Sequence, residues 1–406
     1  MTLGVMALSS MVQALLSPFF WLVVLLVAVQ HHRLARTRRR FLGIPAEPLW
    51  LSVFQATLMG IMGGCLGSGL LLVLGVSLTN AGLPYVWPLA IALMLLSPHL
   101  LCFAYAGGLL ALSSLAFGLP QLEVPQLMGL VGALHLVESF LILLSGHRGA
   151  MPVYLRLGGG EVVGGFNLQR LWPIPLVATA LVAAPYLPPG GIEMPAWWPL
   201  IKPADSGDAA QHFYYLMLPV AAALGYGDLA LTSSPTRRSR RSALTLLAYS
   251  VTLILLAVGA SYRATLALPA ALFAPLGHEL TIILGRRAEL RGPWRYVPPP
   301  GGVMVLDAVW GTPAYRAGLR SGSILRTVNG RRVARREEFA AALEAAGPYV
   351  ELEYTTPGGE WRRVGLRCEA GRPLGLILVP EAGDAPSAVP VTVPPLVAWW
   401  HRLFRK

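Results

Sequence analysis

Long apolar runs, divided by short polar or basic segments, make up most of the chain from its start to about residue 284. A helix needs about 20 mainly apolar residues to cross the hydrocarbon core of a bilayer, and several of the runs reach that length. The pattern therefore predicts a polytopic α-helical membrane region with about seven to nine spans. The nine candidate spans are residues 11–29, 54–78, 82–97, 99–119, 126–144, 173–186, 213–231, 243–260 and 265–284.

Basic residues orient these candidate spans. They cluster in residues 33–40, 148–170, 237–241 and 286–295, and the positive-inside rule places all four clusters on the cytoplasmic side. This arrangement requires a break in the apolar run 87–118, which we expect near the tripeptide Ser97-Pro98-His99. The N-terminus is then outside and the C-terminus inside. Short candidates such as 173–186 are also compatible with re-entrant segments, so seven or eight crossings remain alternatives.

The composition supports a membrane protein and adds little chemistry. Hydrophobic residues make up 55% of the chain, charged residues 13%, and the mean hydropathy is +0.58, values that exclude an ordinary soluble domain. Cys65, Cys102 and Cys368 lack metal-binding spacing, and the first two lie in apolar runs, so we expect buried small side chains and no oxidising compartment. The first apolar run lacks a basic leading region, and no cleavable signal peptide is expected. No nucleic-acid partner is expected.

The pattern changes after residue 293 to short alternating segments. Residues 302–309 predict a first strand, and residues 335–346 predict a helix with Phe339, Ala342 and Leu343 at core spacing. Residues 349–355 alternate between apolar and polar positions, and a Pro-Gly-Gly turn leads to a return strand that contains Val364 and Leu366. These elements predict a small α+β domain.

The segment 311–333 reads GTPAYRAGLRSGSILRTVNGRRV, with Gly318, Gly322 and Gly330 where tight turns favour glycine. This motif resembles a bacterial PDZ domain, a fold that captures an extended peptide as an added strand.

The predicted organisation is a multi-span membrane domain (1–293), a cytoplasmic PDZ domain (294–382), and a Pro-rich tether with an amphipathic tail (383–406). We expect the tail, with Trp399 and Trp400, to lie on the inner leaflet; a frayed basic tail is the alternative.

The resemblance to PDZ domains also implies a peptide groove. Between Arg295 and Gly302 there is no room for the Gly-rich loop that holds the ligand carboxylate, so the segment after the return strand is the candidate, in a circularly permuted order. The alternative is a plain core strand. We expect Arg335 and Arg336 either to attract acidic partner segments or to form a solvated basic face. The predicted peptide-binding residues are Leu374, Gly375, Leu376 and Ile377 on the strand, with Phe339 and Leu343 on the helix.

Several spans with a PDZ domain also describe the site-2 intramembrane metalloproteases. Those enzymes need two histidines one helical turn apart with a glutamate between them. His278 and Glu279 begin such a motif, but Ile282 replaces the second histidine, so no catalytic residue, metal ligand or cofactor is expected. His135 and Glu138 share a helix face and could donate two ligands, without a third.

Together with His99, His278 and Glu279, these two residues could form a polar cluster between helices. Such a cluster serves either interhelical packing or a proton or ion path.

The overall layout resembles the MinJ family of cell-division topological determinants. The resemblance rests on the basic stretch 36–41 after the first span, the segment 99–105, and Gly277-His278-Glu279 before the PDZ linker. It implies a non-enzymatic scaffold at septa and cell poles that contacts the lipid bilayer and bridges DivIVA-like and MinD-like proteins; homo-oligomerisation is left open. The alternatives are a degenerate site-2-protease-like protein that binds peptides without cutting them, and a transporter with a regulatory PDZ domain.

Overall fold

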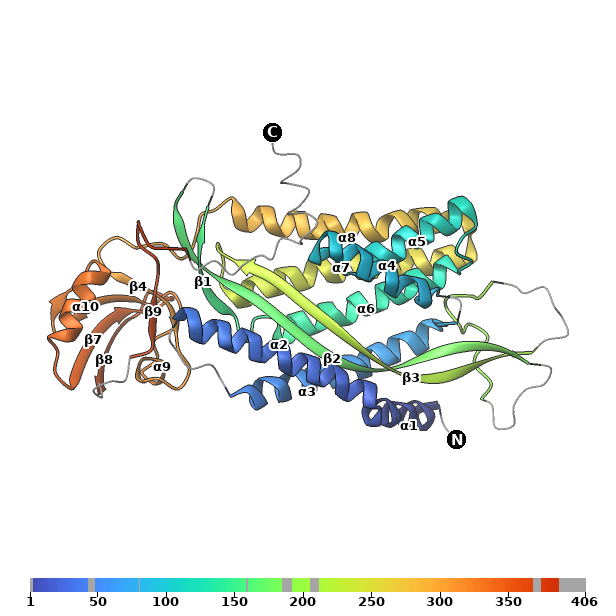
Figure 1. The fold of residues 1–406 in the computed structure, drawn as a ribbon, viewed down its shortest axis with the longest axis horizontal. Coiled ribbons are helices and arrows are strands. Elements are labelled where there is room, and N and C mark those ends of the chain that lie inside the picture. The colour runs from blue at the N-terminus through green and yellow to red at the C-terminus, as the bar shows by residue number, and fades with distance from the viewer. Residues whose placement is uncertain are drawn as a thin grey trace.

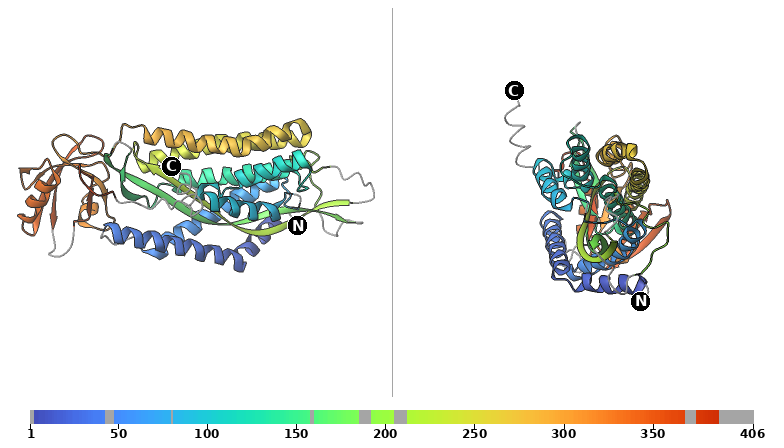
Figure 2. Two further views of the ribbon diagram at one scale, coloured as in Figure 1. Left: turned by 45° about the horizontal axis from the view of Figure 1, so that its top comes forward. Right: turned by 90° about the vertical axis from the view of Figure 1, so that its right-hand side faces the viewer.

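The protein is an elongated bundle of helices that carries a β domain at one end (Figures 1 and 2). The structure is a computed structural model, and it describes residues 3–42, 48–79, 81–157, 160–184, 192–204, 212–367 and 374–386. Most of the predicted tether and the whole tail lie outside the described residues, as does Cys368.

Five helices in the described part of the chain are long and apolar enough to cross a membrane. The predicted spans 54–78, 126–144, 243–260 and 265–284 are confirmed as helices, whereas the predicted span 11–29 is divided at Ser17 between a short helix and a long one. The five long helices are α2 (Pro18–Leu42), α3 (Leu49–Leu74), α6 (Val124–Ser145), α7 (Pro235–Tyr262) and α8 (Ala267–Leu290), and the shorter helix α1 (Leu3–Leu16) precedes them.

The predicted break near Ser97 is confirmed, and it separates two short helices. These are α4 (Leu83–Leu96) and α5 (Phe103–Phe117), with a single 3-10 turn between them. At a rise of 1.5 Å per residue, 14 or 15 residues extend about 21–23 Å, less than the roughly 30 Å of a bilayer core. Cys102, in the break, contacts His135 near the middle of α6. We therefore interpret α4 and α5 as a re-entrant pair that meets at mid-depth.

The predicted helical spans 173–186 and 213–231 are wrong, because the chain forms strands there. β1 (Met151–Arg156), β2 (Val162–Ala184) and β3 (His212–Ala230) make a three-stranded antiparallel sheet. β2 and β3 pair without a bulge from Phe166↔Ala230 to Ala184↔His212. The hairpin runs along the helices (Figure 1), and Trp172 and Ile174 of β2 are fully buried. In the described part of the chain, five long helices, three shorter apolar helices and a β-hairpin thus replace the nine predicted helical spans.

The edge of β2 that faces away from β3 lies against α3. Unpaired backbone groups are costly in an apolar environment, so such an edge must be satisfied or lack donors. Pro173 and Pro175 have no N–H to satisfy. Farther along, the Ser68 hydroxyl accepts the Val177 N–H at 2.8 Å, and the Ser77 hydroxyl accepts the Leu181 N–H at 2.9 Å. Proline and serine together account for the backbone nitrogens of four residues along this edge: Pro173, Pro175, Val177 and Leu181.

Glycines on α3 allow the close approach to β2. A Cβ atom at Gly60 would overlap the carbonyl oxygen of Pro173, and one at Gly64 would overlap that of Pro175. Both carbonyls belong to the strand backbone, which cannot rotate away as a side chain can. The spacing of four residues puts both glycines on one face of α3, so the helix lies directly on the edge of the strand.

The C-terminal β domain contains a six-stranded sheet in the order β8-β7-β5-β4-β9, with β6 paired to β5. The predicted strands 302–309 and 349–355 and the predicted helix 335–346 are confirmed. Asn329 and Gly330, between β5 and β6, both have positive φ, as a two-residue hairpin turn requires. The elements are β4 (Val303–Ala308), α9 (Pro313–Arg316), β5 (Ile324–Val328), β6 (Arg331–Arg332), α10 (Arg336–Glu344), β7 (Tyr349–Thr355), β8 (Trp361–Arg367) and β9 (Leu376–Leu378).

This β domain is docked on the membrane region. Tyr296, shortly before the Pro298-Pro299-Pro300 segment, is fully buried, and its carbonyl accepts the Gly164 N–H at 3.0 Å. Arg38 at the end of α2 forms an ion pair with Asp307 of β4 at 3.3 Å. An apolar cluster joins the two parts and consists of Phe166, Leu168, Ala230, Tyr296, Leu306, Val309, Ile377 and Val379.

Replacing Gly64 with valine is expected to lower the melting temperature of the detergent-purified protein, because the new side chain would overlap the Pro175 carbonyl. Overpacking of this kind costs about 1–3 kcal/mol or more. Gly69→Val is the matched control, since nothing lies within 4 Å of a Cβ at that position of the same helix. Equal melting temperatures for the two variants would contradict the contact between α3 and β2.

Candidate functional sites

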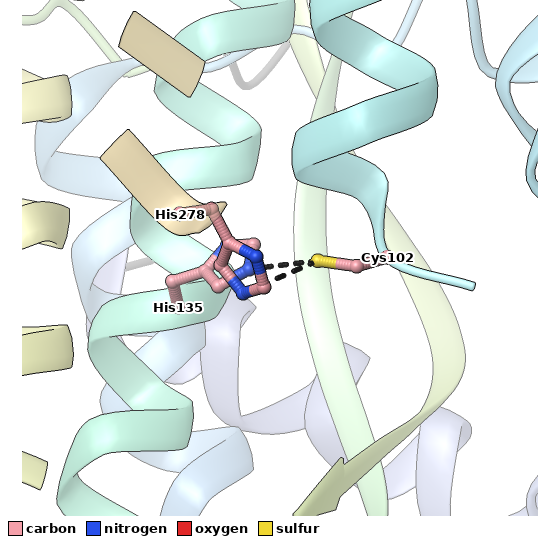
Figure 3. Close-up of side chains that lie close together, drawn as sticks. All are labelled: Cys102, His135 and His278. Atoms are coloured by element: carbon pink, nitrogen blue, oxygen red, sulfur yellow. Dashed lines mark hydrogen bonds between the residues drawn. The ribbon is translucent and has the colours of Figure 1, made fainter. Parts of the chain in front are cut away.

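Three side chains that can bind metals meet inside the membrane region (Figure 3). Cys102 precedes α5, His135 lies near the middle of α6, and His278 lies near the middle of α8. The Cys102 Sγ is 3.0 Å from Nε2 of His135 and 3.8 Å from Nε2 of His278. The candidate ligand atoms of all three residues lie within 4.8 Å of one another. We call this group the Cys-His-His cluster.

Small residues bring the three helices close enough for this contact. Gly108 of α5 lies against Pro275 of α8, where a Cβ would overlap the proline ring. A Cβ at Gly107 would lie 3.3 Å from Val131 of α6, a tight contact. The sequence therefore places α5 directly against α6 and α8, which carry the two histidines.

A backbone contact fixes the orientation of His135. Its Nδ1 is 2.7 Å from the carbonyl oxygen of Val131, one turn earlier in α6. A carbonyl only accepts hydrogen bonds, so Nδ1 carries the proton and, in the neutral ring, Nε2 presents its lone pair to Cys102. In His278, Nδ1 is buried and has no hydrogen-bond partner in the described structure.

Polar and aromatic groups surround the cluster. The Tyr105 hydroxyl donates to Glu279 at 2.5 Å, and the His99 Nε2 lies 3.9 Å from the same carboxylate. The ring of Tyr249 packs against both histidine rings, with centroid separations of 5.4 Å and 5.6 Å. Its hydroxyl donates to the Ala274 carbonyl at 2.8 Å. These contacts hold the imidazoles in place from α5, α7 and α8.

The cluster differs from the polar group expected from the sequence. His135 and His278 are brought together, and Glu279 and His99 lie beside them around Tyr105, but Glu138 is not one of the grouped ligand residues. Cys102 is not assigned to this cluster from the sequence, which predicts only a buried small side chain at that position. Its position in the break between α4 and α5 is the signal that could have identified it, because irregular backbone at membrane depth occurs where it is buried in protein or lines a cavity.

The predicted peptide groove lies at one edge of the C-terminal sheet. β9 is the edge strand, and Leu376 and Leu378 pack on the same cluster as Phe339 and Leu343 of α10. Leu374 and Gly375 are buried just before the strand, and Gly375 has a φ of 81°. Ile377 is the exception among the predicted residues, because its side chain lies in the cluster that joins the β domain to the membrane region.

Two contacts limit access to this edge. The Tyr154 hydroxyl of β1 donates to the Leu378 carbonyl at 2.6 Å. Arg336 binds the Asp384 carboxylate at 2.6 Å and the Val379 carbonyl at 2.7 Å, so its guanidinium is engaged within the domain, whereas Arg335 is exposed. Of the two arginines expected to attract acidic segments, Arg335 is the more accessible.

In comparisons with known proteins, no family model matches the chain and no curated protein matches it. Its function is therefore inferred from its own residues.

Replacing Tyr154 with phenylalanine is expected to lower the free energy of unfolding by about 1 kcal/mol, because the Leu378 carbonyl loses its donor. Burial raises the pKa of Tyr154, so the hydroxyl is protonated and can donate at neutral pH. Thermal unfolding of the full-length protein in detergent measures the effect. Tyr349→Phe is the control, since that ring is 69% exposed. A Tyr154→Phe protein that melts with the wild type would contradict a stabilising contact.

Proposed function

We propose that this membrane protein is a non-enzymatic scaffold whose PDZ-like C-terminal domain captures peptide segments of cytoplasmic cell-division or polarity proteins. Its partners would be DivIVA-like and MinD-like proteins, and its location the septum and cell poles of a bacterial plasma membrane. The observation that carries this proposal is the edge strand β9, whose partly buried leucines pack on the same apolar cluster as Phe339 and Leu343 of α10.

Strand addition at β9 is supported by the direction of its backbone groups. The Gly375 carbonyl accepts from Val309 N–H, and the Val379 N–H donates to the Met304 carbonyl, so both residues face inward across the sheet. Because backbone groups alternate along a strand, Leu376 and Leu378 direct theirs toward the free edge. A partner segment would pair there and place its own side chains between β9 and α10.

The membrane region would restrict how far such a partner extends. A segment that pairs with Leu376 meets the Tyr154 hydroxyl at the next outward carbonyl, that of Leu378. The partner strand therefore either ends before Leu378 or replaces the Tyr154 hydroxyl. Binding and the docking of the β domain would then be linked through one hydrogen bond.

The positions of the basic residues support a cytoplasmic β domain. Arg38 at the end of α2 touches the β domain directly, and the cluster 237–241 begins α7 near the turn after β3. The buried Glu289 at the end of α8 accepts the N–H groups of Leu231 and Thr232, which brings the basic end of α8 to the same place. Basic loops at one end of a helical bundle favour the cytoplasmic side.

A photo-crosslinking residue in place of Leu343 should capture the partner in a rod-shaped Gram-positive host depleted of its own MinJ. We expect adducts with the DivIVA-like or MinD-like protein and enrichment of the tagged chain at septa. The same residue in place of Trp361, which is exposed on β8 at the opposite edge of the sheet, should give none.

The Gly375→Val variant should lose the adducts at an unchanged membrane level, because a side chain there overlaps Thr312 and strains a positive φ. Gly365→Val is its control, since a Cβ at Gly365 on β8 meets nothing within 4 Å. Equal amounts of adduct from crosslinking residues at Leu343 and at Trp361 would refute the proposal. A uniform membrane signal without adducts to either protein would refute it as well.

A further inference from the structure

We propose that Cys102, His135 and His278 form a Zn²⁺ site with an open fourth position at mid-depth of the membrane region. This site is independent of the peptide groove and goes beyond the proposed scaffold function. It rests on the geometry of the three side chains, on their surroundings, and on the broken helix that delivers the thiol (Figure 3).

The two sulfur-to-nitrogen distances fit a tetrahedral ion with little movement. With Zn–S near 2.3 Å and Zn–N near 2.0–2.1 Å, a sulfur and a nitrogen ligand lie about 3.5 Å apart. The two observed separations, 3.0 Å to His135 and 3.8 Å to His278, fall on either side of that value. Side-chain adjustments of about half an ångström would give both ligand pairs the separation that zinc requires.

The surroundings of His135 are those of a metal ligand. Metal-bound imidazoles donate their second ring N–H to a carbonyl or carboxylate, which fixes the tautomer and orients the ring. The Val131 carbonyl does this at 2.7 Å from Nδ1. The Cys102 sulfur lies at the N-terminus of α5, where it accepts the Ala104 N–H at 3.4 Å.

Without an ion the cluster is incompletely satisfied. The Cys102 thiol has one proton and can donate it to only one of the two imidazole nitrogens that face it. If Nε2 of His278 carries its own proton and donates to the sulfur, the buried Nδ1 of the same ring is left without a hydrogen-bond partner among the described residues. Partly satisfied polar groups are costly in an apolar interior, and all three residues lie between membrane helices. A zinc ion would engage the sulfur and both Nε2 atoms at once.

The donor set and the fold indicate which ion binds. One thiolate with two imidazoles favours zinc over magnesium or calcium, which prefer oxygen ligands. Three protein ligands leave a fourth position for water or another small ligand. The break between α4 and α5 places Cys102 at the depth of the two histidines, an irregular backbone that a continuous helix would not provide.

Zinc content of the full-length detergent-purified protein tests the proposal. After equilibration with ZnSO₄ and removal of free metal, we expect about one zinc per chain by mass spectrometry, with binding weakened more than about 100-fold by Cys102→Ser or His278→Asn. The control is Cys65→Ser, since Cys65 lies exposed on α3 outside the cluster and its loss should change nothing. Wild-type zinc content no higher than that of Cys102→Ser would overturn the site.

A second measurement needs no ligand variant. In a protein carrying Cys65→Ser and Cys368→Ser, zinc should slow maleimide labelling of Cys102, and Co²⁺ should give a thiolate-to-cobalt charge-transfer band. A labelling rate that zinc does not change, together with no such band, would overturn the proposal even if the ligand variants fail to fold.

Discussion

The edge of β2 inside a bundle of apolar helices is the constraint on which the rest of the structure depends. A strand edge has donors and acceptors along its length, and an apolar surrounding offers no water to satisfy them. Pro173 and Pro175 have no N–H group, and the hydroxyls of Ser68 and Ser77 accept the N–H groups of Val177 and Leu181. The glycine face of α3 packs directly on the carbonyls of the two prolines. The prolines lie in β2 itself, whereas the glycines and Ser68 lie in α3 and Ser77 follows it, so this edge of the hairpin is satisfied only when α3 is packed on it.

The same hairpin positions both candidate sites. At one end, β1 and β2 contact the C-terminal β domain through Tyr154, Phe166 and the buried Tyr296, so the edge strand β9, the proposed peptide-binding strand, is held against the membrane region. Along the bundle, α3 also packs on α6, and α6 supports α5, α7 and α8. The break between the short helices α4 and α5 places Cys102 beside His135 and His278. The docked β domain and the Cys-His-His cluster are thus positioned by the same hairpin and the helices packed on it.

The sequence predicted the long helices and the C-terminal elements because both depend on local patterns. It failed at 173–186 and 213–231, where apolar composition satisfies a hydropathy window but the partners of the strand edge lie on α3, about a hundred residues away. The two prolines spaced by two residues in β2 were the available signal, since proline interrupts a helix but removes donors from a strand edge. The Cys-His-His cluster was missed for a similar reason: Cys102 is 33 residues from His135 and 176 from His278, and only helix packing joins them.

Backbone hydrogen exchange of the segment 374–380 tests the central claim of partner capture most directly. The Leu376 amide faces the free edge of the sheet, so it should exchange readily in the protein alone in nanodiscs. When a purified DivIVA-like or MinD-like partner is added, the account predicts slower exchange in this segment, with no change in β8 at the opposite edge. Binding of the partner that leaves exchange in 374–380 unchanged would contradict strand addition at β9.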